Sequence, residues 1–466
     1  MGTQKNFPLD LLCEEESLSL FEKRAGAVIK DDRIQRVANE LAKKCGGLPI
    51  LVVAVASGLR ESSLEEWKDT LRRFKNFEEK GLTDIAFLII ELSYNRLHSE
   101  ELKWLFLLCG IMLQSNYSCS LTDLLKYTIG LGLFKNVRTV EEARNALHSS
   151  VKKLKDSCLL LDGYDDGNVR MHDVVRDVAV RIASRDHHVL SRVRTELDQS
   201  PSKDCSLISL RRCTIPKLPD VPWECPELNF FYLGSSDNSL EIPCNFFEKM
   251  KELKVLDLTR LNFPSLPPSL QSLTNLQTLC LDQCVLGDIA PVGQLTNLKI
   301  LSLLISKVKE LPKEIGQLTR LQLLDLTGCT ELVLIPAGVI SSLTSLEDLR
   351  MGSFKEWERG LNDGRSNASV SELKQLRQLT ALEIHIPDAK LLPANIGKQL
   401  KNLHVQNNDE VTAVIKSSHA FPNLESLSLD NLVNLETVCC GQLIAQPFQK
   451  LRSLTLWNLP KLIGRK

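Results

Sequence analysis

The chain has 466 residues, which is enough for two to four domains. Its 57 lysine and arginine residues balance 58 aspartate and glutamate residues, so the net charge is −1 and neither nucleic acid nor an anionic membrane is expected as a partner. No stretch of 18 consecutive apolar residues is present, and we expect no membrane-spanning helix. The 14 cysteines are scattered and follow no signal peptide, so we expect reduced thiols and a cytoplasmic location, with the nucleus as the alternative.

Residues 1–81 are predicted to form a small helical domain. Apolar residues recur at steps of three and four along residues 34–45, behind a cap at Asp31 or Asp32. The glycine pair 46–47 is expected to end this helix, and Pro49 to stand in the first turn of the next one. That next helix is nearly all apolar, and we expect it to be buried.

Residues 82–200 are predicted to form a winged-helix domain. Helices are expected at residues 85–97, 101–112, 121–129 and 140–154, and two strands at residues 159–161 and 168–170. A last helix is expected after Met171 and His172, with Asp173 as its N-cap. Winged helices can read DNA, but aspartates crowd the basic residues of this region and would repel phosphate.

Residues 201–466 repeat the pattern Leu-x-x-Leu-x-Leu about eleven times. The clearest copies begin at Leu253, Leu276, Leu298, Leu321 and Leu346. This pattern is typical of a leucine-rich-repeat solenoid, in which each repeat adds one strand to a parallel sheet. Cys284 and Cys329 fall at the Asn/Cys position of the repeat, where a side chain can satisfy buried backbone groups of the turn or simply fill space. The predicted fold class is therefore multidomain α+β, with two mainly helical domains ahead of an α/β solenoid.

The residues that alternate with the inward leucines are expected to face solvent on an open, strand-lined surface. Such a surface suits binding better than catalysis. The candidates for protein recognition have mixed chemistry, which favours a protein partner over a polyanion; the alternative is that they are only the polar residues that a strand must show to water. They are Asp257, Asp282, Asp325, Arg350, His385 and Trp457.

Four stretches of the first half resemble motifs of one protein family, in the order in which that family carries them. Residues 45–50 (CGGLPI) resemble its Gly-Leu-Pro-Leu motif, and residues 171–177 (MHDVVRD) resemble its Met-His-Asp motif. Residues 92–97 and 105–110 resemble two stretches of its winged helix. With leucine-rich repeats behind them, these matches resemble the NB-ARC leucine-rich-repeat disease resistance proteins of plants. These are intracellular immune receptors, and the likeness is to the coiled-coil type rather than the Toll-receptor type.

The resemblance implies that residues 1–81 are the helical ARC subdomain and residues 82–200 the winged-helix subdomain. It implies an ADP/ATP switch in full-length relatives, with Pro49 beside the adenine and His172 at the phosphates. The implied partners are a pathogen effector or a guarded host protein, and a nucleotide-binding domain in the same molecule or in trans. The implied nucleotide-binding residues are Gly47, Leu48, Pro49, Met171, His172 and Asp173.

The phosphate loop that such a switch requires is not found in this sequence. There is no G-x-x-x-x-G-K-[ST] motif and no coiled-coil domain, so we expect a chain that lacks the P-loop domain and binds ADP weakly or not at all. No catalytic or metal-ligand constellation is evident, and we expect no enzyme, although slow ATP hydrolysis is expected of full-length relatives. The expected function is the regulatory and sensing part of an immune receptor, whose repeats bind a partner or autoinhibit. A leucine-rich-repeat adaptor scaffold and a winged-helix DNA binder are the alternatives.

Overall fold

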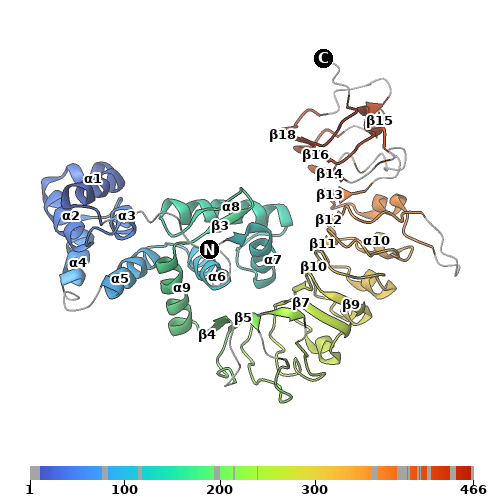
Figure 1. The fold of residues 1–466 in the computed structure, drawn as a ribbon, viewed down its shortest axis with the longest axis horizontal. Helices are drawn as coiled ribbons and strands as arrows, with labels where there is room; N and C mark the ends of the chain where they lie inside the picture. Colours follow the sequence, from blue (N-terminus) through green and yellow to red (C-terminus); the bar gives the residue numbers. More distant parts are fainter. Residues whose placement is uncertain are drawn as a thin grey trace, which may run out of the picture. The chain divides into compact units, whose positions relative to one another are not determined.

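The chain folds into two compact units. The computed structural model describes residues 11–75, 82–113, 118–193, 200–213, 216–238, 240–358, 366–385, 396, 399–406, 409, 411–416, 421–440 and 448–462. A helical unit comprises Met1–Leu125 and Arg144–His187, and a solenoid unit comprises Lys126–Ala143 and His188–Lys466 (Figure 1). Among the helices of the described ranges, none has both the length and the apolar character needed to cross a membrane.

The first five α-helices of the helical unit share a core of apolar side chains. Within that core the rings of Phe21 and Trp67 lie 6.0 Å apart, centroid to centroid. Helices α7 and α8 each run across the boundary between the two units. The bounds are α1 (Glu14–Ala25), η1 (Gly26–Lys30), α2 (Asp32–Lys44), α3 (Pro49–Gly58), α4 (Leu64–Lys75), α5 (Leu82–Asn95), α6 (Glu100–Met112), α7 (Leu121–Leu131), α8 (Val140–Asp156) and α9 (Asp173–Asp186).

The boundary between α2 and α3 confirms the helix signals of the sequence. Asp31 is the N-cap of α2, because its carboxylate accepts a hydrogen bond from the Arg33 N–H at 2.9 Å. Hydrogen bonds from the Arg33 side chain and backbone lower the pKa of Asp31 to about 2. Gly46 and Gly47 follow α2 with φ of 59° and 71°, a conformation that favours glycine, and Pro49 opens α3.

A small antiparallel sheet accompanies the later helices of the helical unit. Its order is β1 (Cys119–Ser120), β3 (Asn168–Arg170) and β2 (Leu161–Asp162). The first of the two expected strands is predicted at residues 159–161 but begins at Leu161. Leu159 and Leu160 lie buried in the bend that precedes this strand. Helix α9 packs closely on α6 at Gly110, where an added Cβ would lie 2.5 Å from the Cβ of Ala179.

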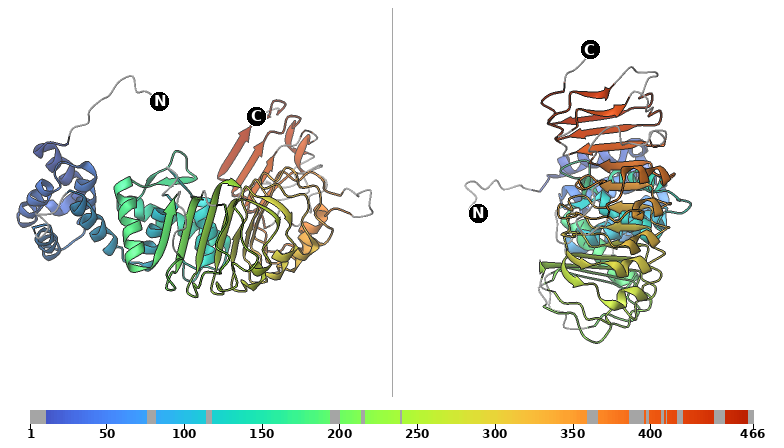
Figure 2. Two further views of the ribbon diagram at one scale, coloured as in Figure 1. Left: turned by 60° about the horizontal axis from the view of Figure 1, so that its bottom comes forward. Right: turned by 90° about the vertical axis from the view of Figure 1, so that its right-hand side faces the viewer.

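The solenoid unit is built on one parallel sheet, whose strands stack as successive rungs (Figure 2). The order along the sheet is β4, β5, β6, β7, β8, β10, β11, β12, β13, β14, β16 and β18, with β9 paired to β7 beside this path. The bounds are β4 (Val189–Val193), β5 (Leu207–Cys213), β6 (Phe230–Asn238), β7 (Val255–Ser265), β8 (Thr278–Cys280), β9 (Val285–Asp288), β10 (Ile300–Ser302), β11 (Leu323–Asp325), β12 (Asp348–Met351), β13 (Ala381–Ile384), β14 (Asn402–Gln406), β15 (Ala413–Lys416), β16 (Ser426–Asp430), β17 (Thr437–Cys440) and β18 (Ser453–Trp457).

The short helices of the solenoid lie in the segments that return from one strand to the next. Their bounds are η2 (Pro268–Ser272), η3 (Ala290–Gln294), η4 (Lys313–Gln317), α10 (Val339–Ser342) and η5 (Val370–Gln375). Beside the main sheet, β15 and β17 form a separate parallel pair.

The second leucine of the repeat forms one continuous column through the core, which confirms the predicted solenoid. From Leu256 to Leu427 the leucines of this column are at most 2 % exposed. Burying a leucine side chain stabilises the fold by roughly 1.5–3 kcal/mol, so the column is a main source of stability. The strand register aligns Leu256, Leu279, Leu301, Leu324, Leu349, Leu382, Leu403, Leu427 and Leu454.

The cysteines at the consensus turn position act as hydrogen-bond donors to backbone, which is one of the two roles that the repeat pattern left open. The Cys284 thiol donates to the Leu258 carbonyl, and the Cys329 thiol to the Leu303 carbonyl, each at 2.9 Å. Both acceptors belong to the preceding repeat, so each thiol ties two rungs together. Burial raises the pKa of both thiols to about 12, which keeps them protonated as donors.

A left-handed residue recurs at the same point of four consecutive repeats, two residues after the third leucine. Arg260, Gln283, Ile305 and Gly328 have φ of 61°, 58°, 57° and 73°. Glycine adopts this conformation without strain, whereas a β-branched side chain does so at a cost of about 1–2 kcal/mol. Ile305 is also 57 % exposed, so little apolar burial offsets its strain.

Candidate recognition surface of the solenoid

The sheet has one face turned away from the leucine core, and all six predicted recognition residues lie on it or at its strand ends. Four of them are nevertheless buried, so the expectation that they face solvent is wrong. The exposed fractions are 3 % for Asp257, 5 % for Asp282, 2 % for Asp325 and 8 % for His385. The Arg350 side chain is 22 % exposed, and only Trp457, at 67 %, is largely open to solvent.

Burial of the first two aspartates has a specific cause, which is residues 126–143. This stretch, here called the covering segment, belongs to the solenoid unit and lies against the sheet face. It includes the second half of α7, the loop after it and the first turn of α8. Its contacts on the sheet involve side chains from β6 to the start of β14.

Lys126 is the most deeply placed residue of the covering segment, with no exposed surface. Its Nζ donates hydrogen bonds to Asp282 Oδ2 and to Ser302 Oγ, both at 2.9 Å. The other oxygen of Asp282 accepts from the Ser302 hydroxyl at 2.6 Å and from the Leu304 N–H at 2.9 Å. Buried charges are tolerated only with such partners. The sheet supplies these partners of Lys126, and the sheet and the covering segment together supply those of Asp282.

Tyr127 makes a second contact of the same kind one residue further on. Its hydroxyl donates to Asp257 Oδ2 at 2.6 Å, and Asp257 Oδ1 accepts from the Thr259 hydroxyl. The tyrosine ring meets the Phe230 ring edge to face, with centroids 5.1 Å apart and planes at 89°. Backbone joins in as well, because Thr278 donates its hydroxyl proton to the Lys126 carbonyl at 2.9 Å.

Gly130 explains how the helix can lie directly on the strands. An added Cβ would lie 2.5 Å from Thr278 Oγ1 and 2.6 Å from Val255 Cγ2, both in the sheet. Glycine inside a helix costs about 1 kcal/mol relative to alanine, so its presence within α7 needs a reason. The close approach of helix and sheet provides that reason.

The far end of the covering segment is held by a buried carboxylate. Glu347 Oε2 accepts from the Val140 N–H at 2.7 Å, at the first turn of α8, where a negative charge is favourable. The Gln322 amide bridges this end by donating to Glu347 Oε1 at 2.8 Å and to the Arg138 carbonyl at 2.9 Å. Burial raises the pKa of Glu347, the largest effect on this carboxyl.

Past Glu347 the sheet face carries charges that pair with one another. Arg350 donates to Asp348 at 3.0 Å and lies 3.5 Å from Asp325. Burial alone would lower the pKa of Arg350, but these two carboxylates offset it and hold the pKa above its ordinary value. The register continues this row to Glu383 and then to His404, whose Nδ1 lies 3.7 Å from Glu383 Oε2.

A further ion pair ties the covering segment to the strand that follows. Lys401, just before β14, places its Nζ 2.7 Å from both carboxylate oxygens of Glu141. Both side chains are about one-third exposed, so solvent screens this pair and it contributes little to stability.

The residues implied as nucleotide ligands lie in the helical unit, where the first motif has a structural role. Gly47 is buried, and the Leu12 N–H donates to its carbonyl at 2.9 Å. A Cβ at Gly47 would lie 2.4 Å from the Leu12 carbonyl oxygen, so the close approach requires glycine. Leu48 is the N-cap of α3 and packs against the core of the unit, whereas Pro49 is exposed.

The second motif is the start of α9. The N-cap is His172 rather than the predicted Asp173, because His172 Nδ1 accepts the Val174 N–H at 3.3 Å. Asp173 lies inside the first turn and pairs instead with Arg176 at 2.6 Å. Met171 is buried just ahead of the cap. Val174 packs against the same core as Leu48, so both motifs border one apolar cluster.

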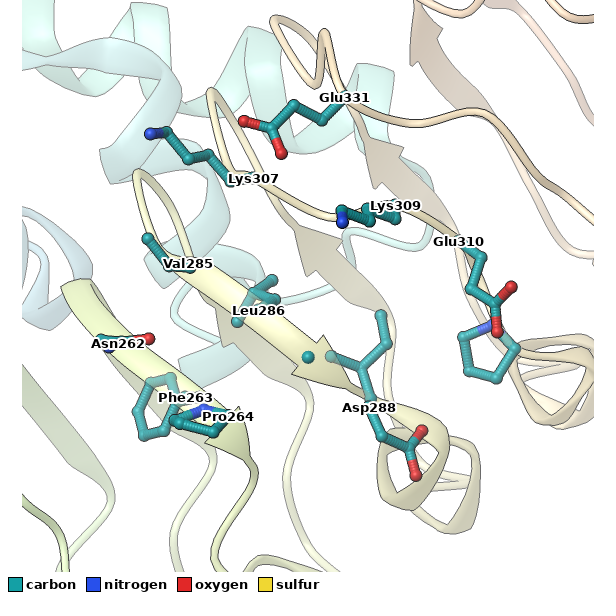
Figure 3. A pocket seen from close by; sticks show the side chains of 13 residues that line it. Asn262, Phe263, Pro264, Val285, Leu286, Asp288, Lys307, Lys309, Glu310 and Glu331 are labelled. Carbon is teal, nitrogen blue, oxygen red and sulfur yellow. The ribbon is translucent and has the colours of Figure 1, made fainter.

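An open hollow of about 660 Å³ lies beside the sheet, where β9 pairs with the end of β7 (Figure 3). Its floor includes Phe263 and Leu286, and its rim carries both Lys307 and Glu331. The charges are of both signs and spread along the rim. In the part of the chain that the structure describes, no group of three or more His, Cys, Asp or Glu side chains could hold a metal ion.

Comparison with known proteins agrees with the fold. Residues 288–463 match the family model described as a leucine-rich repeat region. The Arabidopsis thaliana disease resistance protein At4g27190 is 32 % identical over 297 residues, which covers 61 % of this chain and 30 % of that protein. The probable disease resistance protein At4g27220 of the same plant is 30 % identical over 293 residues, covering 61 % of this chain and 32 % of that protein. The chain thus spans about a third of the length of these curated relatives.

Similarity to solved structures is limited. The leucine-rich-repeat protein LIC12759 of Leptospira interrogans is 21 % identical, with 59 % of this chain and 86 % of that chain covered and a TM-score of 0.33. The sheet, its register and the matching family model define this chain as a leucine-rich-repeat protein. The curated relatives are disease resistance proteins of plants, and the chain is similar to them over about three-fifths of its length.

Proposed function

We propose that this chain is the sensing and regulatory part of an intracellular plant immune receptor. The covering segment holds the sheet face closed, and a protein partner, either a pathogen effector or a guarded host protein, binds the face once the segment has left. The observation that carries this proposal is the fully buried Lys126 on Asp282, with Tyr127 on Asp257 beside it. The charged residues of this surface already have bonding partners within the same chain. A partner protein can therefore bind them only after the covering segment has left.

The test is to weaken the segment and follow both structure and response. In the Lys126→Ala variant, amide hydrogen exchange of residues 126–143 and of strands β8 and β10 should rise. With a nucleotide-binding domain supplied in trans, the variant should also give a defence response in plant tissue without any pathogen. A matched control is Lys309→Ala, an exposed lysine on the rim of the lateral hollow, which should change neither readout. A response that stays silent while the strands become exchangeable would overturn the regulatory role.

In full-length relatives the helical unit would contribute to an ADP/ATP switch through Gly47, Leu48, Pro49, Met171, His172 and Asp173. Support comes from the packing of both motifs around one core, since a change at one would be felt at the other. We infer that this chain alone binds ADP weakly or not at all, because its sequence has no phosphate loop. Nucleotide released by denaturing the purified chain should be far below one equivalent, and a stoichiometric yield of ADP would contradict the inference.

A further inference from the structure

The two aspartates beneath the covering segment are held ready by the sheet itself. Asp282 Oδ1 is fixed by the Ser302 hydroxyl and the Leu304 N–H, and Asp257 Oδ1 by the Thr259 hydroxyl. All of these partners belong to the strands and their following turns, so they remain when the segment leaves. In each carboxylate the other oxygen, Oδ2, is the one that meets the segment. The sheet therefore carries a preorganised pair of acceptors.

The floor around these acceptors carries an aromatic ring, and a helix that lies on it approaches the strands closely. Phe230 presents its ring to the tyrosine, and Val255 and Thr278 leave no room for a side chain above them. The occupant therefore needs three features in fixed order. They are an ammonium group, a phenol at the next residue and a residue without a Cβ at the fourth position after the ammonium, as in Lys126, Tyr127 and Gly130.

We propose that this surface is a docking site for a partner-protein helix that presents the same three groups, so that the partner enters by replacing the covering segment. The inference rests on the proposed function, since the segment must leave first. It adds the chemistry of the partner helix, which carries a cationic residue, an aromatic residue next to it and a small residue about one helical turn after the cationic one. Two carboxylates close together attract a cation and repel a polyanion, so a nucleic acid or an acidic segment does not fit.

The probe is a fluorescent peptide of residues 121–143 of this chain, used with the full chain. In the wild-type chain the covering segment competes within the same molecule, so the peptide should bind weakly. A full-chain variant with both Lys126→Ala and Tyr127→Ala weakens the segment but leaves Asp257 and Asp282 intact. Because the apparent affinity rises with the fraction of open sites, the peptide should bind this variant at least about tenfold more tightly.

Three matched reagents show whether the binding is specific. A peptide with alanine at the positions of Lys126 and Tyr127 should lose most of its binding. Adding Asp282→Asn to the double variant should have the same effect, because the carboxylate charge is gone while the shape is kept. Circular dichroism shows that each variant is folded. A single-stranded oligonucleotide should not compete, and its competing as well as the peptide would overturn the proposal.

Hydrogen exchange separates this inference from the proposed function. If strands β8 and β10 become exchangeable in the double variant and the peptide still fails to bind, the docking site is refuted while the covering role stands. If the strands stay protected, Gly130→Val provides a second way to lift the segment, because its side chain collides with Val255 and Thr278. Protection that persists in both variants would refute the covering role, and the docking site with it.

Discussion

Replacing Asp282 by leucine should loosen the covering segment far more than replacing Lys126 and Asp282 together. At the observed 2.9 Å, the attraction between the ammonium and carboxylate groups is about 6 kcal/mol at an effective dielectric constant of about 20. Removing both charges from water costs several kcal/mol each, so the pair as a whole contributes little net free energy. Asp282→Leu removes the attraction but leaves the Lys126 ammonium in a site with no exposed surface.

The expected loss for Asp282→Leu is about 3–5 kcal/mol, the usual consequence of orphaning a buried charge. Lys126→Met should lose only about 1–3 kcal/mol, since Ser302 and Leu304 continue to bond the carboxylate. In the double variant, two apolar side chains of similar length meet, and the loss should be smaller than that of Asp282→Leu alone. The favourable coupling between the two positions is then at least about 1 kcal/mol, the smallest loss expected for Lys126→Met.

Hydrogen exchange of the amides in β8 and β10 measures this free energy locally, which suits a chain of more than one unit. A loss of about 4 kcal/mol lowers protection roughly a thousandfold. The urea dependence of exchange shows whether the segment lifts or the whole solenoid opens. A double variant as weak as the sum of the two single variants would refute the reasoning, because the charges would then act independently.

Three further outcomes follow from single residues. Ile305→Asn should raise the free energy of unfolding by about 1 kcal/mol in urea titrations, because asparagine tolerates the positive φ better than a β-branched residue; an unchanged midpoint would contradict the strain. Gly130→Ala should lower the protection of the covering segment, since the collision with Thr278 and Val255 outweighs the gain in helix propensity. The pKa of Glu347 is raised in the fold. The contribution of this carboxyl to folding stability is therefore fully present at pH values below its ordinary pKa of 4.5, and it is lost as the pH rises through the raised pKa. Glu347→Gln should therefore flatten that pH dependence of exchange at Val140, and an unaltered profile would assign it to another group.

The repeats could be predicted from the sequence because their signal is local. Leucine spacing alone places the column from Leu256 to Leu427 in the core, and the turn position of Cys284 and Cys329 makes a bond to backbone one of two expected roles, beside filling space. Each of these inferences uses residues within one repeat or the next. The regular stacking of parallel strands then brings the equivalent residues of successive repeats into line.

The covering of the sheet face could not be predicted in this way, because its partners are far apart in the chain. Lys126 and Asp282 are separated by 156 positions, and no periodicity connects them. Two weak signals were available in residues 124–134 (LLKYTIGLGLF): a single lysine in an otherwise apolar run, and a glycine directly after the helix predicted at residues 121–129. A lone charge in such a run indicates a buried partner, and a glycine can mark a close backbone contact, but neither names the strand that provides it.

The covering segment also changes how the solenoid can come apart. In repeat proteins each repeat contacts only its neighbours, so unfolding can begin at one end and proceed rung by rung. Here one short stretch of chain reaches from Phe230 on β6 to Lys401 beside β14, and so ties together strands that never touch each other. While the covering segment is in place, we expect these repeats to unfold together as one cooperative unit. Once the segment lifts, we expect each repeat to be coupled only to its neighbours, so that the sheet can change its curvature when a partner binds.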